Sequence, residues 1–176
     1  MSAVRLDAHT REPFADGHRF TEGGAYGVIT ATAHYAVDPE APANRPITDL
    51  DLASRDSGGD GVVRFNGDVE ILRPVDGERR RQFFDWGNRG NKRAVQYFCD
   101  APHTNRPRTP ADAGNGYLLR RGYTVVFGAW QGDLLPGEGR LLLDLPVATR
   151  GTEPVRGLTT AEFIVDTPVR SLPLSR

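Results

Sequence analysis

Residues 123–130 read YTVVFGAW, an almost continuous apolar run between Gly122 and the polar pair Gln131–Gly132. Strands of a parallel sheet are buried on both faces, and they carry such runs instead of alternating polar and apolar residues. The run is also rich in β-branched and aromatic side chains, which favour strands. It therefore predicts a buried strand that pairs in parallel with a neighbour.

The segment before this run supplies that neighbour. Residues 82–86 are predicted to form a short strand and residues 91–98 the start of a helix, with a glycine turn between them. A proline-rich loop follows, after which Asp112 can cap a short helix that ends before Gly122. Residues 82–130 therefore predict one β-α-β unit with a right-handed crossover.

The rest of the chain is predicted to be rich in strands. Residues 25–37 read AYGVITATAHYAV and form a long strand, and residues 62–75 form a second strand or a bent pair. These early elements suggest antiparallel pairing. A short strand is expected at residues 47–52 within a polar loop, and two more at residues 140–147 and 158–169. The fold class is thus predicted to be α/β, with antiparallel strands followed by a single crossover.

Length and composition indicate one domain over residues 1–176, because 38% hydrophobic residues in a chain of 176 can bury a sizeable core. A net charge of -1 gives no electrostatic basis for binding nucleic acid or an anionic membrane. The first twenty residues lack the apolar core of a signal peptide, so a cytoplasmic location is expected. Cys99 is the only cysteine, which excludes an intrachain disulfide, and it is expected to be a buried, inert thiol.

The turn WGNRGNK, residues 86–92, is the strongest candidate for chemistry. Its glycines allow backbone N–H groups to point outward where the following helix would add its own unpaired donors. Such a turn can bind an anion, either the oxyanion of an acyl-transfer intermediate or a phosphate. Because the glycine spacings of phosphate-binding loops are missing, the oxyanion is favoured. The alternative is that Gly87 and Gly90 only shape a tight turn.

A series of motifs occurs in a distinctive order: REPFADG, HYAVDP, DLDLA, ILRPVD, NRGNK, DAGNGYLLRRGYTVV and WQGDL. In this order they resemble the N-terminal part of a family of large bacterial α/β-hydrolase-domain proteins. The resemblance implies the β-rich opening portion of an α/β-hydrolase sheet, in which an amide of the loop after the third strand contributes to an oxyanion hole. It places Asn88, Arg89, Gly90 and Asn91 in that anion-binding turn. Pocket-lining residues would be Trp130, Gln131 and Asp133, although for Asp133 the alternative, capping of the turn that follows, is favoured.

The sequence departs from that family at the nucleophile. No G-x-S-x-G elbow is present, and neither the serines nor the histidines stand where the triad requires them. The serines are Ser2, Ser54, Ser57, Ser171 and Ser175, and the histidines are His9, His18, His34 and His103. We therefore expect a fragment, a truncated product or one part of a split enzyme.

Two functions follow as expectations. The first is the N-terminal segment of a serine hydrolase that acts on a small acyl substrate once a C-terminal part completes it. The second is a non-catalytic, β-rich module that binds a small anion or a protein partner. No cofactor or metal motif is present, so neither is expected. The strand at residues 123–130 is expected to leave one neighbour position open, where self-association or a partner chain could occur.

Overall fold

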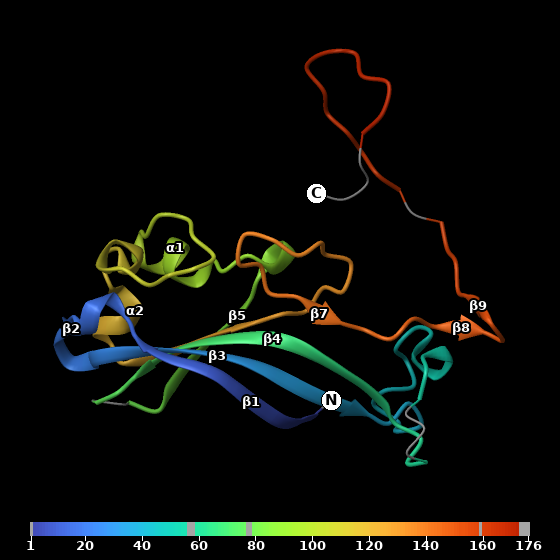
Figure 1. The fold of residues 1–176 in the computed structure, drawn as a ribbon, viewed down its shortest axis with the longest axis horizontal. Helices are drawn as coiled ribbons and strands as arrows, with labels where there is room; N and C mark the ends of the chain where they lie inside the picture. Colours follow the sequence, from blue (N-terminus) through green and yellow to red (C-terminus); the bar gives the residue numbers. More distant parts are fainter. Residues whose placement is uncertain (1, 56–58, 77–78, 159, 173–176) are drawn as a thin grey trace.

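The computed structural model describes residues 2–55, 59–76, 79–158 and 160–172. The strands of its main sheet are β1 (Ser2–Pro13), β2 (Arg19–Phe20), β3 (Gly24–Val37), β4 (Val63–Pro74), β5 (Arg81–Trp86), β6 (Tyr123–Gly128) and β7 (Leu143–Asp144). Five of them follow the order β1-β3-β4-β6-β5, while β2 pairs with β3 and β7 pairs with β4 (Figure 1). A separate hairpin joins β8 (Thr149–Arg150) to β9 (Glu153–Pro154).

The long strands β1, β3 and β4 form an antiparallel ribbon. β3 pairs with β4 along almost its whole length, from Tyr26 opposite Pro74 to Val37 opposite Val63. This confirms the predicted strands and their antiparallel pairing. β1 was not predicted, because its sequence is charged and most of its side chains are exposed at the edge of the sheet. Charged side chains on an edge strand oppose pairing with other chains and weaken the hydrophobic pattern.

β5 and β6 pair in parallel, with Arg81 opposite Tyr123 and Trp86 opposite Gly128, as the sequence predicted. The prediction that residues 123–130 leave a neighbour position open is wrong. β6 is flanked by β4 on one side and β5 on the other, which explains why its apolar run is buried. Among the described residues, no strand pairs with the outer side of β5, so the open edge belongs to β5 instead.

The predicted α/β class is also wrong: the described chain is a β-rich mixed sheet with two short α-helices. α1 (Ala94–Cys99) has 6 residues and α2 (Tyr117–Arg120) has 4. The segment between β5 and β6 cannot form longer helices because Pro107 and Pro110 interrupt it, and Gly114 and Gly116 adopt positive φ. The expected cap Asp112 instead completes a capping box with Thr109 in the 3-10 turn η5 (Pro110–Ala113).

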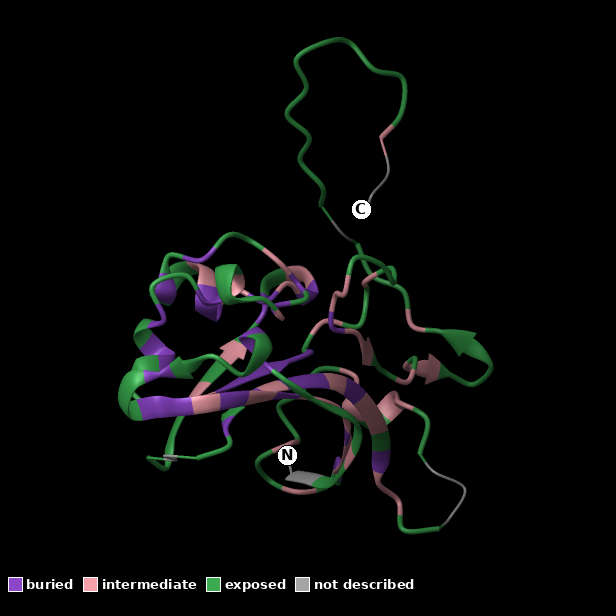
Figure 2. Cartoon of the chain, turned by 60° about the vertical axis from the view of Figure 1, so that its left-hand side comes forward, coloured by how far each residue is buried: buried purple, intermediate pink, exposed green. Residues whose placement is uncertain are grey.

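Three further strand predictions fail because short irregular segments replace them. Residues 47–52 contain the 3-10 turn η3 (Leu50–Leu52) instead of a strand. Residues 140–147 contribute only the two residues of β7. The described part of residues 158–169 contains no strand, and in Figures 1 and 2 this segment extends away from the sheet.

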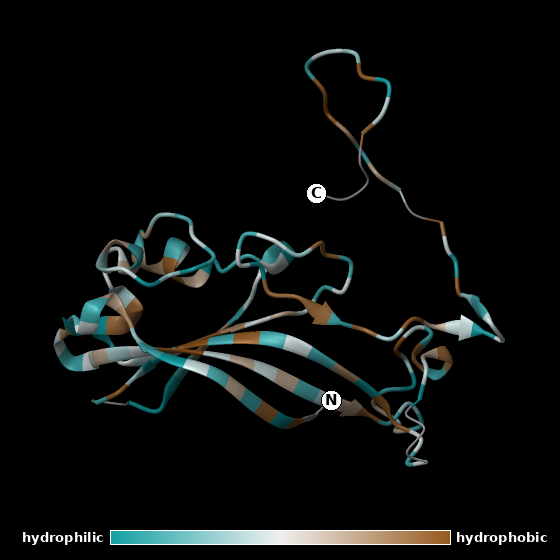
Figure 3. Ribbon diagram, viewed as in Figure 1, coloured by the Kyte–Doolittle hydropathy of each residue, from teal (hydrophilic) through white to brown (hydrophobic). Residues whose placement is uncertain are grey.

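Two hydrophobic clusters lie on opposite faces of the sheet, as the alternation of side chains along the strands requires. The larger joins the helices to the upper face in Figure 1, where Leu72 and Val125 pack with Leu119. The smaller includes Val69 and Val126 on the face that no described helix covers. Figure 3 shows the apolar stretch along the central strands. Cys99 is fully buried in the larger cluster, as predicted, and burial raises the pKa of its thiol.

Candidate functional site

The two turns identified from the sequence follow the carboxyl ends of the neighbouring strands β5 and β6. Trp86 ends β5 and lies opposite Gly128, which ends β6, so the segments that follow both strands begin side by side. The first contains the 3-10 turn η4 (Asn88–Gly90), and the second contains the WQGD sequence. Carboxyl ends of neighbouring parallel strands are a common location for ligand sites in open sheets.

Three polar contacts clamp these turns together. The Trp130 indole N–H donates to the Gly87 carbonyl at 3.0 Å, and the Arg89 backbone N–H donates to Gln131 Oε1 at 2.6 Å. The Arg89 guanidinium binds the Asp133 carboxylate at 2.6 Å, which holds the pKa of that carboxyl below its usual range. The structure therefore brings together the predicted residues of both turns. Asp133 binds the other turn and does not only cap its own.

Several backbone donors of the first turn and of the helix after it have protein acceptors. Asp85 Oδ2 accepts from the N–H groups of Arg93 and Ala94 at 2.7 and 2.8 Å. Asn105 Oδ1 accepts from the Lys92 N–H at 3.0 Å. The expectation of unpaired donors at this helix N-terminus is therefore wrong for Arg93 and Ala94, because the Asp85 carboxylate accepts from both. The acceptors of the Arg89 and Lys92 N–H groups are both neutral amides, but Gln131 is half-buried whereas Asn105 is buried.

The other predicted turn residues hold its shape. Asn88 is exposed, and its carbonyl accepts from the Asn91 side chain at 2.8 Å, while Asn105 donates to Asn91 Oδ1 at 2.9 Å. Gly90 has φ +74°, and a Cβ there would lie 2.7 Å from the Leu141 carbonyl oxygen. Glycine is therefore required at position 90 for its positive φ and for the close approach of the Leu141 backbone.

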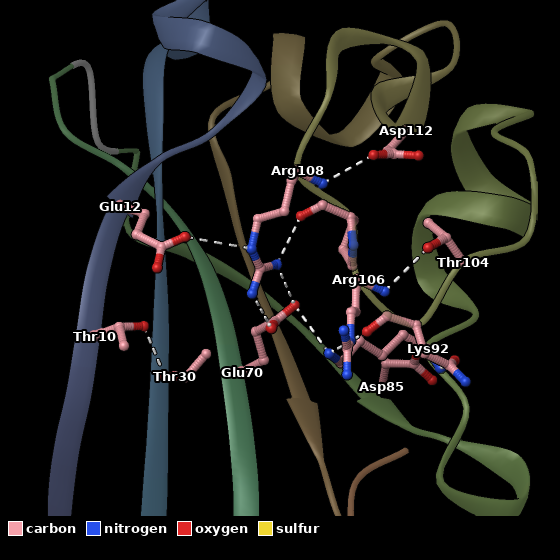
Figure 4. A network of polar contacts seen from close by, with 12 residues as sticks. Thr10, Glu12, Thr30, Glu70, Asp85, Lys92, Thr104, Arg106, Arg108 and Asp112 are labelled. Atoms are coloured by element: carbon pink, nitrogen blue, oxygen red, sulfur yellow. Dashed lines mark hydrogen bonds and ion pairs between the residues drawn. The ribbon is translucent and has the colours of Figure 1, made fainter. Parts of the chain in front are cut away.

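A buried ionic network holds the turn against the sheet (Figure 4). The Glu70 carboxylate, on β4, lies 3.1 Å from Lys92 Nζ and 2.8 Å from Arg108 Nη2. Lys92 Nζ also donates to the Asn105 carbonyl at 2.6 Å, and Glu12 lies 3.7 Å from Arg108. Glu70 and Lys92 are each 3% exposed. Burial lowers the pKa of the Lys92 ammonium, while the Glu70 carboxylate opposes that shift.

An open apolar groove of about 570 Å³ lies beside the two turns. It is lined by Tyr35, Phe65, Trp86, Ala129, Trp130, Leu143 and Leu145. The rings of Tyr35 and Phe65 stack at 4.9 Å, and they lie on β3 and β4 at the end of the sheet from which the two turns emerge. The groove thus crosses several strands at this end of the sheet. Both tryptophans of the chain line it.

Sequence reasoning missed Asp85, Glu70, Asn105 and Arg108, as well as the groove. Asp85 lies nine residues before Ala94, too far along the chain to be recognised as a local helix cap. The partners of Glu70 lie 22 and 38 residues away, so no local pattern reveals them. The groove depends on residues from four strands, whose alignment only the fold provides.

The serines of the described residues do not form a nucleophile elbow. Ser2 lies in β1, Ser54 lies in a loop, and Ser171 lies in the segment that extends from the sheet, so none stands at a strand-to-helix turn. Ser57 and Ser175 lie outside the described residues. His34 pairs with Asp7 at 3.0 Å on β3 and β1, and His9 contacts Thr32 at 2.8 Å on the same two strands.

No protein-family model, curated protein or solved structure matches this chain. Across residues 2–55, 59–76, 79–158 and 160–172, no three histidine, cysteine or acidic side chains are grouped so that they could hold a metal ion. The helices of that same part of the chain are too short to cross a membrane. The functional argument therefore depends on the two clamped turns and their surroundings.

Proposed function

We propose that this chain supplies the oxyanion-binding turn of a serine hydrolase that acts on carboxylic esters or related acyl compounds. In this proposal the nucleophile belongs to a polypeptide segment outside residues 1–176. The ordered motifs that resemble the N-terminal part of bacterial α/β-hydrolase-domain proteins support this function. The observation that carries it is the position of the Arg89 N–H. This group lies just beyond the carboxyl ends of two parallel strands, and its acceptor is a neutral side chain.

The Arg89 amide is suited to exchange one acceptor for another. Hydrogen bonds to a charged acceptor are roughly twice as strong as those to a neutral one. An oxyanion formed during acyl transfer would therefore compete well with Gln131, whereas it could not easily displace the Asp85 carboxylate from Arg93 and Ala94. One such donor contributes about 2.7–4 kcal/mol of transition-state stabilisation in a complete serine hydrolase.

The open edge of β5 gives the missing segment a place beside this amide. A strand added in parallel to β5 would have its carboxyl end beside Trp86, close to Asn88 and Arg89. A serine elbow lies directly after such a strand, at its carboxyl end. Phe84 and Trp86 are 39% and 61% exposed on β5, which is an unfavourable edge for a self-contained binding module. The exposed edge therefore favours the hydrolase segment over the module.

Labelling of the purified chain with a fluorophosphonate probe, together with hydrolysis of a short chromogenic ester, tests where the nucleophile lies. The probe reacts with a serine that a neighbouring base has activated. We expect no labelling and no turnover by this chain alone. Stoichiometric labelling of any of its five serines would contradict the proposal, because the chain would then carry its own nucleophile.

A further inference from the structure

The two turns of the proposed oxyanion site each begin at a tryptophan that lines the apolar groove. Trp86 lines the groove and directly precedes Gly87, while Trp130 lines it and directly precedes Gln131. The hydrogen bond from the Trp130 indole to the Gly87 carbonyl fixes one wall of the groove to the turn that bears Arg89. The turn that bears Arg89 is therefore anchored to the wall of the groove.

We infer that this groove binds the apolar acyl chain, alkyl or aryl, of the ester whose carbonyl oxygen binds at Arg89. The inference rests on the proposed function and specifies its substrate class. A volume of about 570 Å³ falls within the usual range for small-molecule sites, and the lining is almost entirely apolar. A charged or strongly polar acyl group would lose its hydration there without gaining partners. The groove thus selects apolar acyl groups.

Intrinsic fluorescence can measure occupation of the groove, because both tryptophans of the chain line it. The probes are 1-hexanol and 1-octanol, which carry an alkyl chain but no charge and therefore do not require the Arg89 amide. We expect a saturable blue shift of the emission with both alcohols. Each added methylene should tighten binding about four-fold, and the two alcohols should therefore differ by about fifteen-fold.

Two matched variants locate the binding site. Leu145→Asp places a charge in the groove wall and should weaken 1-octanol binding at least ten-fold, at about the level expected for a charge without a partner. Leu135→Asp makes the same change at a leucine that is 59% exposed and does not line the groove, and it should leave binding unchanged. Leu145 is itself 45% exposed, so the variant should fold, and its thermal unfolding midpoint verifies this.

The outcomes separate this inference from the proposed function. If neither alcohol gives a saturable shift, or if Leu145→Asp binds them as the unchanged chain does, the groove is not an acyl site, whatever the Arg89 amide binds. A dimer detected by light scattering and dissociated by Leu145→Asp would also overturn the inference, since a second copy would then occupy the groove. Binding of alcohols without any response of the Arg89 amide to anions would support the groove and contradict the oxyanion turn.

Discussion

Replacement of Glu70 by methionine is expected to lower the free energy of unfolding by about 3–5 kcal/mol, the usual cost of removing one partner from a buried ion pair. The variant would leave the Lys92 ammonium 3% exposed and without its carboxylate, and would remove the 2.8 Å contact to Arg108. Equilibrium unfolding in urea measures the loss. The double variant Glu70→Met/Lys92→Met should recover much of it, because the buried ammonium is gone and the Arg108 guanidinium, 30% exposed, keeps Glu12 at 3.7 Å.

The control for this experiment is Glu40→Met, which makes the same substitution in an exposed ion pair. Glu40 lies 3.1 Å from Arg55, and the two side chains are 66% and 37% exposed. Exposed pairs contribute about 0–1 kcal/mol, so this variant should unfold close to the unchanged chain. Equal losses for Glu70→Met and Glu40→Met would show that the network in Figure 4 does not hold the turn in place.

Gly87→Ala is expected to disrupt the candidate site more than any single side-chain truncation on its surface. A Cβ at position 87 would lie 2.0 Å from the Asn91 carbonyl oxygen, which is backbone and cannot rotate away. The turn must therefore open, at a cost of about 1–3 kcal/mol or more, as for overpacked sites in protein cores. Its opening would also displace the Gly87 carbonyl from the Trp130 indole, so we expect a red shift of the tryptophan emission along with lower stability.

Gly157→Ala provides the matched control, because a Cβ there meets no heavy atom within 4 Å. It should change the free energy of unfolding by less than about 0.5 kcal/mol, as is usual for exposed positions, and leave the emission spectrum unchanged. If Gly87→Ala behaved like this control, the turn would not have the close packing on which the site depends.

The elements that could be predicted from the sequence are those with a strong local pattern. β3, β4, β5 and β6 were recognised because their apolar and β-branched residues are locally concentrated, and the parallel pair followed from the helix-bearing connection between two of them. β1 was missed because its charged residues weaken the apolar pattern of a strand that pairs with β3 along most of its twelve residues. Helix content was overestimated because proline and glycine interrupt the segment between β5 and β6.

The sequence was sufficient to locate the two turns of the candidate site but not to predict the contacts between them. The turn at residues 88–91 and the WQGD segment were both identified, and they do meet in space. Their mutual contacts could not be predicted, because Arg89 and Gln131 are separated by 42 residues and depend on the register of two parallel strands. The contact of the Asp85 carboxylate with the Arg93 and Ala94 N–H groups could not be predicted either, because it joins residues eight and nine positions apart across the turn.

Backbone amide NMR can detect whether an anion replaces Gln131 as the acceptor of the Arg89 N–H. Methylphosphonate serves as a tetrahedral oxyanion, titrated into the unchanged chain, Gln131→Leu and Gln131→Glu. Removal of the neutral acceptor saves about 1 kcal/mol on binding, so Gln131→Leu should bind about five-fold tighter. Gln131→Glu supplies a permanent charged acceptor and should abolish binding.

The Ala94 amide is the internal reference, since the Asp85 carboxylate holds it at 2.8 Å. We expect methylphosphonate to shift the Arg89 resonance saturably and to leave the Ala94 resonance in place. Its affinity should decrease in the order Gln131→Leu, unchanged chain, Gln131→Glu. An Arg89 resonance that does not respond in any of the three proteins, or that shifts no more than Ala94, would contradict the assignment of an oxyanion-binding turn.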